Sequence, residues 1–225
     1  MANDILRNRQ SPVGRFLTEL RPGGRFITLE GIDGAGKSSH MRFIARFLQA
    51  RGIKVKVTRE PGGTPVGETL RRLVLKSRNR LHSETETLLM FAARREHLAK
   101  IIGPALERGI WVLCDRFTDA TYAYQAGGSG VPWDKIGVLE HWVHPELRPD
   151  LTILFDVSPA TGRKRIGRKG KPDRFERERD AYFERVRAAY LRRARAGAGR
   201  IRVVDAHGTL PQVKKELENI LSTFC

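Results

Sequence analysis

The sequence predicts an α/β fold in which helices cover both faces of a five-stranded parallel sheet. Runs with strand patterns alternate with segments of helical periodicity, and these runs lie near residues 26–29, 53–58, 110–114, 151–157 and 201–204. The run at 110–114 is almost continuously apolar, as expected for a parallel strand that is buried on both faces. The first run leads through a glycine-rich turn into a helix, which begins the alternation.

Length and composition indicate one globular domain. The chain has 225 residues, of which 40% are hydrophobic, and no apolar run approaches the roughly 18 residues of a membrane span. We assign residues 25–225 to the domain and expect residues 1–24, which end in a Pro-Gly-Gly turn signal, to form a mobile extension. No signal-peptide pattern opens the chain, and Cys114 and Cys225 are its only cysteines. We therefore expect a soluble cytoplasmic protein without a disulfide framework or a membrane partner.

The formal net charge of +17 leaves two interpretations open. A basic protein is a candidate for nucleic-acid binding. Much of the excess, however, lies in the arginine-rich stretch 163–202, where a solvated basic face is the simpler interpretation. No basic segment is interleaved with aromatic residues that stack on bases, so we expect no nucleic-acid partner.

The glycine-rich turn has the pattern of a phosphate-binding loop, Gly-x-x-x-x-Gly-Lys-Ser from Gly31 to Ser38. Glycines let backbone N–H groups surround an anion, and the start of the following helix adds partial positive charge. Lys37 can reach the β- and γ-phosphates of a nucleotide, and Ser38 offers a hydroxyl to Mg²⁺. The candidate ATP-binding residues are Gly31, Ile32, Asp33, Gly34, Ala35, Gly36, Lys37, Ser38 and Ser39.

Further along the chain, the pattern places polar residues at strand ends and predicts several helices. The loop 58–64 holds Glu60, which either contacts a ligand or belongs to an ordinary strand-to-helix turn. Ser83-x-x-Glu86 predicts a capping box that opens a helix reaching about Ile102 and interrupted by Gly103-Pro104, with apolar residues on two sides. Asp115 and Arg116 end the buried strand. Asp115 is a candidate to contact Mg²⁺ indirectly, and Arg116 is a candidate to bind a phosphate. Residues 126–130 are predicted to be flexible, and helices are expected from Ser158-Pro159, over 176–195 and at the C-terminus.

Residues 163–174 combine dense positive charge with glycines and a proline, which predicts a cationic loop. Such a loop either acts as a lid that brings an arginine to a transferring phosphoryl group, or remains a solvated basic loop. Composition alone favours the second interpretation.

Taken together, these motifs resemble the thymidylate kinases of bacteria. The resemblance runs from Phe26 to the C-terminal helix and rests on the phosphate loop, Thr-Arg-Glu-Pro-Gly-Gly at 58–63, Phe-Ala-Ala-Arg at 91–94, Asp-Arg-Phe at 115–117 and Ala-Tyr-Gln at 123–125. It implies a homodimer with a phosphate-loop kinase fold that transfers the γ-phosphoryl group of ATP to dTMP with Mg²⁺. It also implies catalytic roles for Lys37, Asp33 and Arg116 and for a lid arginine, Arg168 or Arg165.

The resemblance implies a further set of contacts with dTMP, made by Asp33, Glu60, Arg71, Phe91, Arg94, Arg116, Thr121, Tyr124 and Gln125. In this set Arg116 and Arg71 hold the acceptor phosphate, Arg94 and Gln125 contact thymine, and Tyr124 crowds the 2′ position. Ser38, Glu60 and Asp115 are the residues expected near the metal.

The chain departs from the family pattern at the base-stacking position, where the family has an aromatic residue four positions before Arg94. Met90 occupies that position here and Phe91 follows it about 100° further round the helix, so either of them is a candidate. Three alternatives to a dTMP kinase remain: a kinase for another nucleoside monophosphate, an ATP-dependent nucleic-acid-binding protein and a silent nucleotide sensor.

Overall fold

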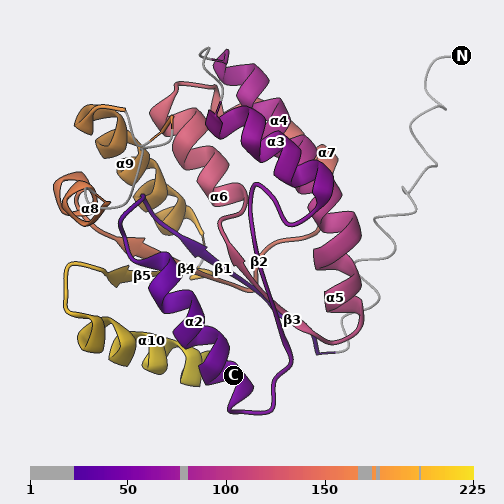
Figure 1. Ribbon diagram of the computed structural model, residues 1–225, viewed down its shortest axis with the longest axis vertical. Helices are drawn as coiled ribbons and strands as arrows, with labels where there is room; N and C mark the ends of the chain where they lie inside the picture. Colours follow the sequence, from indigo (N-terminus) through magenta and orange to yellow (C-terminus); the bar gives the residue numbers. More distant parts are fainter. Residues whose placement is uncertain (1–22, 77–80, 167–173, 176–177, 198) are drawn as a thin grey trace, which may run out of the picture.

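The computed structural model describes residues 23–76, 81–166, 174–175, 178–197 and 199–225. Nearly all of the expected extension 1–24, Arg168 and most of the predicted lid lie outside this part of the chain. The described strands form one sheet in the order β2-β3-β1-β4-β5, and all neighbouring strands are parallel (Figure 1). The strands are β1 (Phe26–Glu30), β2 (Val55–Arg59), β3 (Trp111–Asp115), β4 (Leu151–Asp156) and β5 (Ile201–Asp205). The predicted fold class is confirmed.

The central strand β1 is buried along its whole length because it has neighbours on both edges and helices on both faces. Leu29 pairs with Asp115 of β3 and Ile153 of β4, so the carboxyl ends of these strands meet at one edge of the sheet. Ligands of open α/β sheets collect outside that edge.

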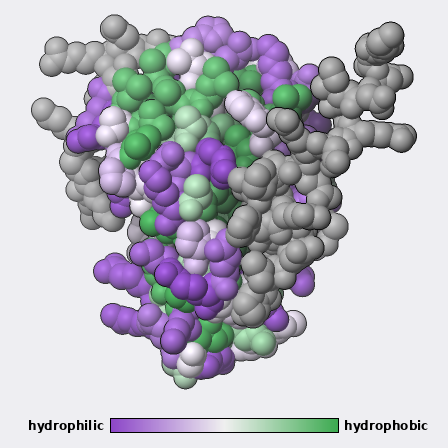
Figure 2. Space-filling model, turned by 90° about the vertical axis from the view of Figure 1, so that its right-hand side faces the viewer, coloured by the Kyte–Doolittle hydropathy of each residue, from purple (hydrophilic) through white to green (hydrophobic). Residues whose placement is uncertain are grey.

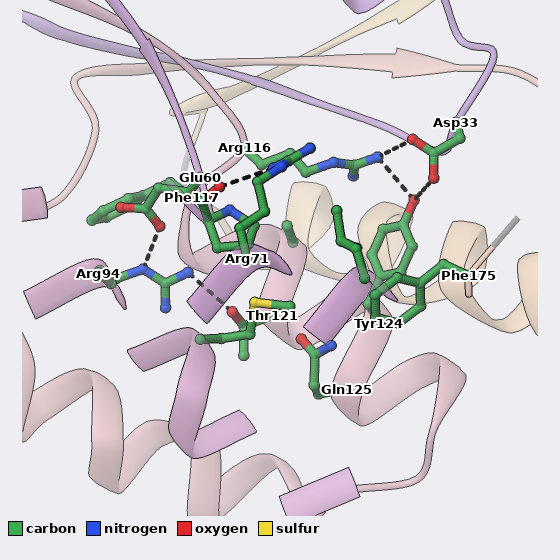
Figure 3. A pocket seen from close by; sticks show the side chains of 14 residues that line it. Asp33, Glu60, Arg71, Arg94, Arg116, Phe117, Thr121, Tyr124, Gln125 and Phe175 are labelled. Carbon is green, nitrogen blue, oxygen red and sulfur yellow. Dashed lines mark hydrogen bonds and ion pairs between the residues drawn. The ribbon is translucent and has the colours of Figure 1, made fainter. Parts of the chain in front are cut away.

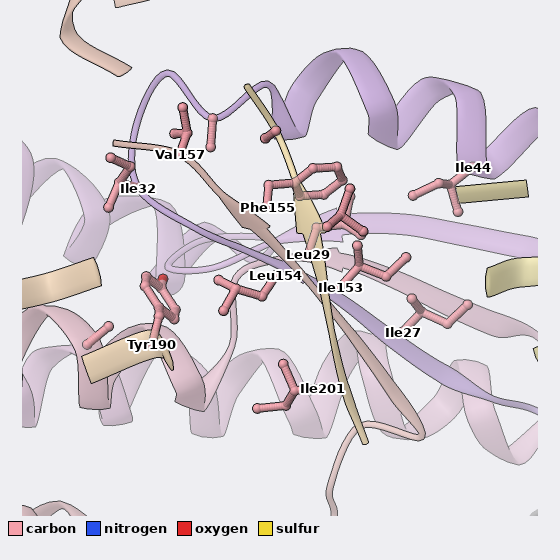
Figure 4. Close-up of a cluster of buried hydrophobic side chains, with 14 of the residues drawn as sticks. Ile27, Leu29, Ile32, Ile44, Ile153, Leu154, Phe155, Val157, Tyr190 and Ile201 are labelled. Atoms are coloured by element: carbon pink, nitrogen blue, oxygen red, sulfur yellow. The ribbon is translucent and has the colours of Figure 1, made fainter. Parts of the chain in front are cut away.

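One face of the sheet is covered by α2 (Lys37–Gln49) and α10 (Leu210–Phe224) (Figure 1). Ile27 and Leu29 of β1 lie in one buried cluster with Ile44 of α2, as Figure 4 shows. Ile44, Ala45 and Leu48 follow the predicted helical spacing, and their burial against the sheet fixes the helix that begins at the end of the phosphate loop.

Helices that follow α3 along the chain cover the other face. The long predicted helix is α4 (Ser83–His97), which continues through a π-helical turn, η1 (Leu98–Ile102), into α5 (Gly103–Glu107). The same face of the sheet also carries α6 (Thr118–Thr121), a second π-helix η2 (Tyr122–Gly128) and α9 (Asp180–Ala196). The remaining helices are α3 (Pro65–Lys76), α7 (Trp133–Val143) and α8 (Pro159–Ile166).

Several local predictions were wrong. The N-cap of α4 is His82, whose Nδ1 accepts from the backbone N–H of Glu84 at 3.3 Å; Glu86 is fully buried instead of closing a capping box. Gly103-Pro104 does not end the helical path, because Pro104 lies in the first turn of α5, where its missing N–H costs no helical hydrogen bond. Residues 126–128 of the segment that was expected to be flexible belong to η2, and Ala126 and Gly128 are buried.

Two further differences concern α7 and α8. Helix α7 was not predicted, because its exposed Val138 and Trp142 obscure a one-sided apolar pattern. The start of the predicted cationic loop is helical, since residues 163–166 complete α8. Within the ranges that the structure describes, no helix is both long and apolar enough to cross a membrane.

Candidate active site

The phosphate loop connects β1 to α2 at the carboxyl edge of the sheet. Gly36 has φ 92° and Gly34 has φ 79°, values that side-chain-bearing residues rarely adopt. A Cβ on Gly34 would also lie 2.1 Å from the carbonyl oxygen of Gly162, so this approach of loop and α8 requires glycine. The Lys37 side chain is 6% exposed, and its Nζ donates to the carbonyl oxygens of Gly31 and Ile32, each at 2.9 Å. The glycine conformations and the Lys37 contacts therefore hold the loop in an anion-binding shape.

This loop forms one wall of a cavity of about 670 Å³, which we name the loop cavity. Of the predicted ATP-binding residues, those from Asp33 to Ser39 line it, whereas Gly31 and Ile32 lie behind them. Asp115 and Arg165 also line the loop cavity, and Nη1 of Arg165 donates to the carbonyl oxygen of Ala206 at 2.8 Å. Arg165 is thus the lid candidate that the structure brings to the phosphate loop, while Arg168 lies outside the described residues.

A second cavity, which we name the aromatic cavity, lies beside the first (Figure 3). It is lined by Asp33, Glu60, Pro61, Arg71, Leu75, Met90, Arg94, Arg116, Phe117, Ala120, Thr121, Tyr124, Gln125 and Phe175. Every residue expected to contact dTMP is in this set except Phe91. Phe91 does not line the cavity: its ring is 2% exposed and lies 6.4 Å from that of His144, and of the two base-stacking candidates Met90 is the one that lines the cavity.

The two cavities share part of their lining. Asp33, Glu60, Arg71 and Arg116 line both, so the cavities meet at a wall that carries two arginines and two carboxylates. Ligands bound in the two cavities would therefore approach each other across these four side chains. Arginine is well suited to such a wall, since its planar fork binds phosphate oxygens in pairs.

Arg116 is the centre of the shared wall. Its Nη1 donates to the carbonyl oxygen of Gly31 at 2.9 Å and to the hydroxyl of Tyr190 at 3.0 Å. Its Nη2 donates to Oδ1 of Asp33 at 2.6 Å and to the hydroxyl of Tyr124 at 3.0 Å (Figure 3). The backbone of Arg116 has φ 69°, in the left-handed region that is strained for a residue with a side chain. The surrounding hydrogen bonds hold this residue in one orientation.

Asp33 is held as a carboxylate by its partners. Burial acts to raise the pKa of Asp33, but Arg116 and Lys37 outweigh burial, and the pKa lies below its ordinary value. The hydroxyl of Tyr124 donates to Oδ2 of Asp33 at 3.0 Å. Burial in turn raises the pKa of Tyr124 far above its ordinary value, so the phenol keeps its proton as a donor.

Glu60 holds Arg94 in place. Its two oxygens accept from Nε of Arg94 at 2.8 Å and pair with Nδ1 of His97 at 3.0 Å. Burial acts to raise the pKa of Glu60, but Arg94 and His97 outweigh burial and lower it. Nη2 of Arg94 donates to Thr121 at 3.0 Å, whereas its buried Nη1 has no hydrogen-bond partner among the described residues. Arg94 lines the aromatic cavity, and its Nη1 is a donor that the described residues leave unpaired.

The candidate metal residues differ in how free their oxygens are. Both oxygens of Glu60 are already paired, so this carboxylate suits the orientation of Arg94 better than direct metal ligation. Asp115 and Ser38 both line the loop cavity, and Oδ1 of Asp115 is buried without a hydrogen-bond partner in the described chain. A carboxylate and a hydroxyl are hard oxygen donors that fit Mg²⁺. The described residues contain no group of three or more His, Cys, Asp or Glu that could hold a metal. Mg²⁺ at this site would take most ligands from water and phosphates.

Glu30 and Tyr190 are site residues that the sequence analysis did not single out. Glu30 is fully buried at the end of β1; its Oε1 accepts from the backbone N–H of Phe117 at 2.7 Å. Its Oε2 accepts from the hydroxyl of Tyr190 at 2.8 Å, and this hydroxyl contacts Arg116. Glu30 thus holds the backbone that follows Arg116 directly and orients the guanidinium group through Tyr190. Its signal in the sequence was a carboxylate in an otherwise buried strand.

Glu30 also predicts a pH dependence of stability. Burial, followed by the charge of Asp119, raises the pKa of Glu30 from 4.5 to about 8. Between these pH values the folded state holds a proton that the unfolded state releases, so the free energy of unfolding decreases as pH rises. We expect Glu30→Gln, which stays neutral, to remove up to about 1.4 kcal/mol per pH unit of this slope. Urea unfolding at several pH values measures it, with exposed Glu218→Gln as the control; equal slopes for wild type and Glu30→Gln would contradict the prediction.

The arrangement limits the chemistry to a narrow class. A preformed anion-binding loop in one cavity and an arginine-rich wall shared with a second cavity suit a reaction between two phosphorylated compounds. With the parallel sheet, these features define a nucleotide kinase of the phosphate-binding-loop class.

The comparisons with known proteins narrow this class to one family. The sequence model of the family Thymidylate kinase matches residues 29–217. Proteins named thymidylate kinase from Methylobacillus flagellatus and Nitrosomonas europaea are 56% and 57% identical over 201 residues, which cover 89% of this chain and 98% and 94% of the relatives. The crystal structure of thymidylate kinase from Ehrlichia chaffeensis superposes with a TM-score of 0.74 at 34% identity, covering 89% of this chain and 100% of that one. The chain belongs to the thymidylate kinase family.

Proposed function

We propose that this enzyme binds ATP in the loop cavity and dTMP in the aromatic cavity. It transfers the γ-phosphoryl group of ATP to dTMP, giving dTDP and ADP. The observation that carries the assignment of the cavities is their shared wall of Asp33, Glu60, Arg71 and Arg116. A phosphate at the mouth of each cavity would meet at this wall, which is the geometry that phosphoryl transfer needs.

On the acceptor side, Arg116 and Arg71 hold the phosphate of dTMP. The phosphate is already an anionic nucleophile, so alignment and charge neutralisation matter more than a general base. The free Nη1 of Arg94 donates to a carbonyl oxygen of thymine, and Gln125 contacts the base from the other side of the cavity. Met90 and Phe175 supply apolar walls, and Tyr124, anchored to Asp33 and Arg116, crowds the 2′ position.

On the donor side, the backbone of the phosphate loop and Lys37 surround the β- and γ-phosphates. Lys37 exchanges its contacts with the carbonyl oxygens of Gly31 and Ile32 for phosphate oxygens. Arg165 lies across the loop cavity, where its charge stabilises the transferring group. Several of the chain's many basic residues thus face two polyanionic substrates, and this role requires no nucleic acid.

We propose that Ser38 and Asp115 hold Mg²⁺ in the loop cavity, Ser38 directly and Asp115 through water. When bound, Mg²⁺ neutralises phosphate charge and orients the triphosphate. Replacing Ser38 with alanine removes one oxygen donor, so we expect the Mg²⁺ concentration for half-maximal activity to rise by about tenfold. Titration of activity with Mg²⁺ at fixed ATP measures this shift, and Ser222→Ala, an exposed serine of α10, is the control. An unchanged Mg²⁺ dependence would remove Ser38 from the metal site.

We further propose that the enzyme is a homodimer that pairs through α3, α4 and α7. Large exposed apolar side chains occur on these helices: Val66, Leu73, Leu88, Val138 and Trp142, which is 79% exposed. Figure 2 shows hydrophobic side chains gathered on the upper part of the face that includes these helices. Apolar patches of this kind are costly in a monomer and are typical of protein–protein contacts. We also propose a cytoplasmic location, which the free state of both cysteines supports.

The dimer proposal predicts the effect of one surface substitution. Trp142→Glu places a charge on the apolar face at its most exposed side chain, so we expect the dimer to dissociate at micromolar concentration while the fold is kept. Sedimentation equilibrium measures the mass, and Val203→Glu, on β5 away from this face, should remain dimeric. A monomeric wild-type enzyme would overturn the proposal.

A further inference from the structure

Glu86 lies behind the aromatic cavity and does not line it. The side chain is 0% exposed and projects from the first turn of α4. Its Oε1 accepts from Nε2 of Gln125 at 2.8 Å, and its Oε2 forms an ion pair with Arg174. A fully buried carboxylate needs partners of this kind, and both of them are donors.

These two contacts fix the direction of the Gln125 amide. A carboxylate between two donors accepts hydrogen bonds only, so it binds the amide nitrogen and repels the amide oxygen. Gln125 is 2% exposed and lines the aromatic cavity, so its amide has little freedom beyond a flip. Figure 3 shows the amide oxygen on the Thr121 side and the nitrogen on the opposite side. Gln125 therefore turns its amide oxygen, a hydrogen-bond acceptor, toward a ligand on the Thr121 side of the cavity.

We propose that Glu86 is a positioning residue that selects the base of the acceptor nucleotide by holding Gln125 as an acceptor. Thymine and uracil carry a proton on N3 that such an oxygen accepts. Cytosine has a lone pair on N3, which would face the amide oxygen without a hydrogen bond. This inference rests on the proposed contact between Gln125 and the base, and adds to it the residue that sets its polarity.

Arg174, the second partner of Glu86, also contacts the wall of the aromatic cavity. It lies 4.9 Å from the ring centre of Phe175, which lines the aromatic cavity and packs edge-on against Tyr124 at 5.5 Å. Glu86 thus joins the base-reading amide to the wall formed by Phe175. Because Glu86→Gln also weakens this second contact, the test must separate base selection from a general loosening of the cavity.

The test compares kcat/KM for dTMP, dUMP and dCMP in wild type, Glu86→Gln, Gln125→Ala and the double variant. A glutamine at position 86 can donate or accept, so the amide of Gln125 becomes free to flip. We expect the dTMP-to-dCMP ratio to fall about 10- to 100-fold in Glu86→Gln, which is the usual cost of one unpaired buried polar group. The dTMP-to-dUMP ratio should stay within about threefold of wild type, because both bases carry the N3 proton. The double variant should match Gln125→Ala.

Control variants distinguish the role of Glu86 from the contact between Gln125 and the base. Glu84→Gln changes an exposed glutamate on the same helix and should alter neither ratio. Glu86→Asp keeps a carboxylate, which still only accepts hydrogen bonds. It should therefore keep the dTMP-to-dCMP ratio even if total activity falls. If Gln125→Ala lowers this ratio and Glu86→Gln does not, or if both ratios fall together in Glu86→Gln, the inference is overturned and the contact of Gln125 stands. If Gln125→Ala leaves the ratio unchanged, the base contact itself is wrong. Should Glu86→Gln fail to fold, loss of the ratio in folded Glu86→Asp overturns the inference.

Discussion

Lys37→Ala should lower kcat by at least about 10³-fold while the fold is kept. The Lys37 ammonium is the compact cation of the loop cavity, buried among the backbone groups of the phosphate loop. In the transition state it would neutralise oxygens of the transferring group, and no other lysine lines this cavity within the described chain. Burial and the charge of Arg116 lower its pKa, which means that the free enzyme holds this cation at a cost that bound phosphates remove.

The measurement is steady-state ADP formation with dTMP, together with thermal unfolding followed by circular dichroism. Lys215→Ala, an exposed lysine of α10, is the matched control and should retain wild-type turnover. Removing a buried charge that costs free energy should leave the melting temperature near or above that of wild type. Turnover of Lys37→Ala near the wild-type rate would exclude the role given to the phosphate loop.

Arg116→Lys should produce the second-largest loss, about 10²- to 10³-fold in kcat/KM for dTMP, with a smaller change in KM for ATP. The guanidinium group makes four hydrogen bonds, to Gly31, Tyr190, Asp33 and Tyr124, in a planar pattern. A lysine keeps the charge but has a single tetrahedral donor group, so it cannot hold these partners and a phosphate together. The backbone strain at φ 69° is the same for both residues and does not contribute.

Separate titrations of dTMP and ATP resolve the two effects, and Arg202→Lys, on the exposed side of β5, is the control. A loss confined to ATP would assign Arg116 to the donor side of the shared wall. A loss of less than about threefold for both substrates would mean that charge alone, and not the fork geometry, is what the reaction needs.

Much of the fold was predictable because its determinants are local. The five strands and α2 follow from alternation, apolar runs and helical spacing, and the phosphate loop follows from the placement of Gly31, Gly36 and Lys37. Where local patterns compete with tertiary contacts, the prediction failed. Glu86 has the spacing of a capping box, yet its carboxylate accepts from the buried Gln125 and forms an ion pair with the partly buried Arg174.

The candidate site was predictable where a motif carries it and not where distant segments meet. Asp33, Arg94, Arg116 and Gln125 come from motifs, and all four reach the aromatic cavity. Glu30 and Tyr190 are 160 positions apart, and their contact follows only from packing α9 against β1. The choice between Met90 and Phe91 depends on how α4 is rotated, which its surroundings decide.

The direct test of the central claim is ADP production from ATP and Mg²⁺ with dTMP, dUMP, the ribose form of TMP, dCMP, dGMP and AMP as separate acceptors. We predict strong turnover with dTMP, weaker turnover with dUMP and little with the ribose form, because the proposed binding mode gives thymine polar partners in the aromatic cavity and places Tyr124 against a 2′ hydroxyl. A different best acceptor would contradict the roles given to Arg94, Tyr124 and Gln125. If no acceptor increased ADP production, this would contradict the central claim that ATP in the loop cavity transfers a phosphoryl group to dTMP in the aromatic cavity.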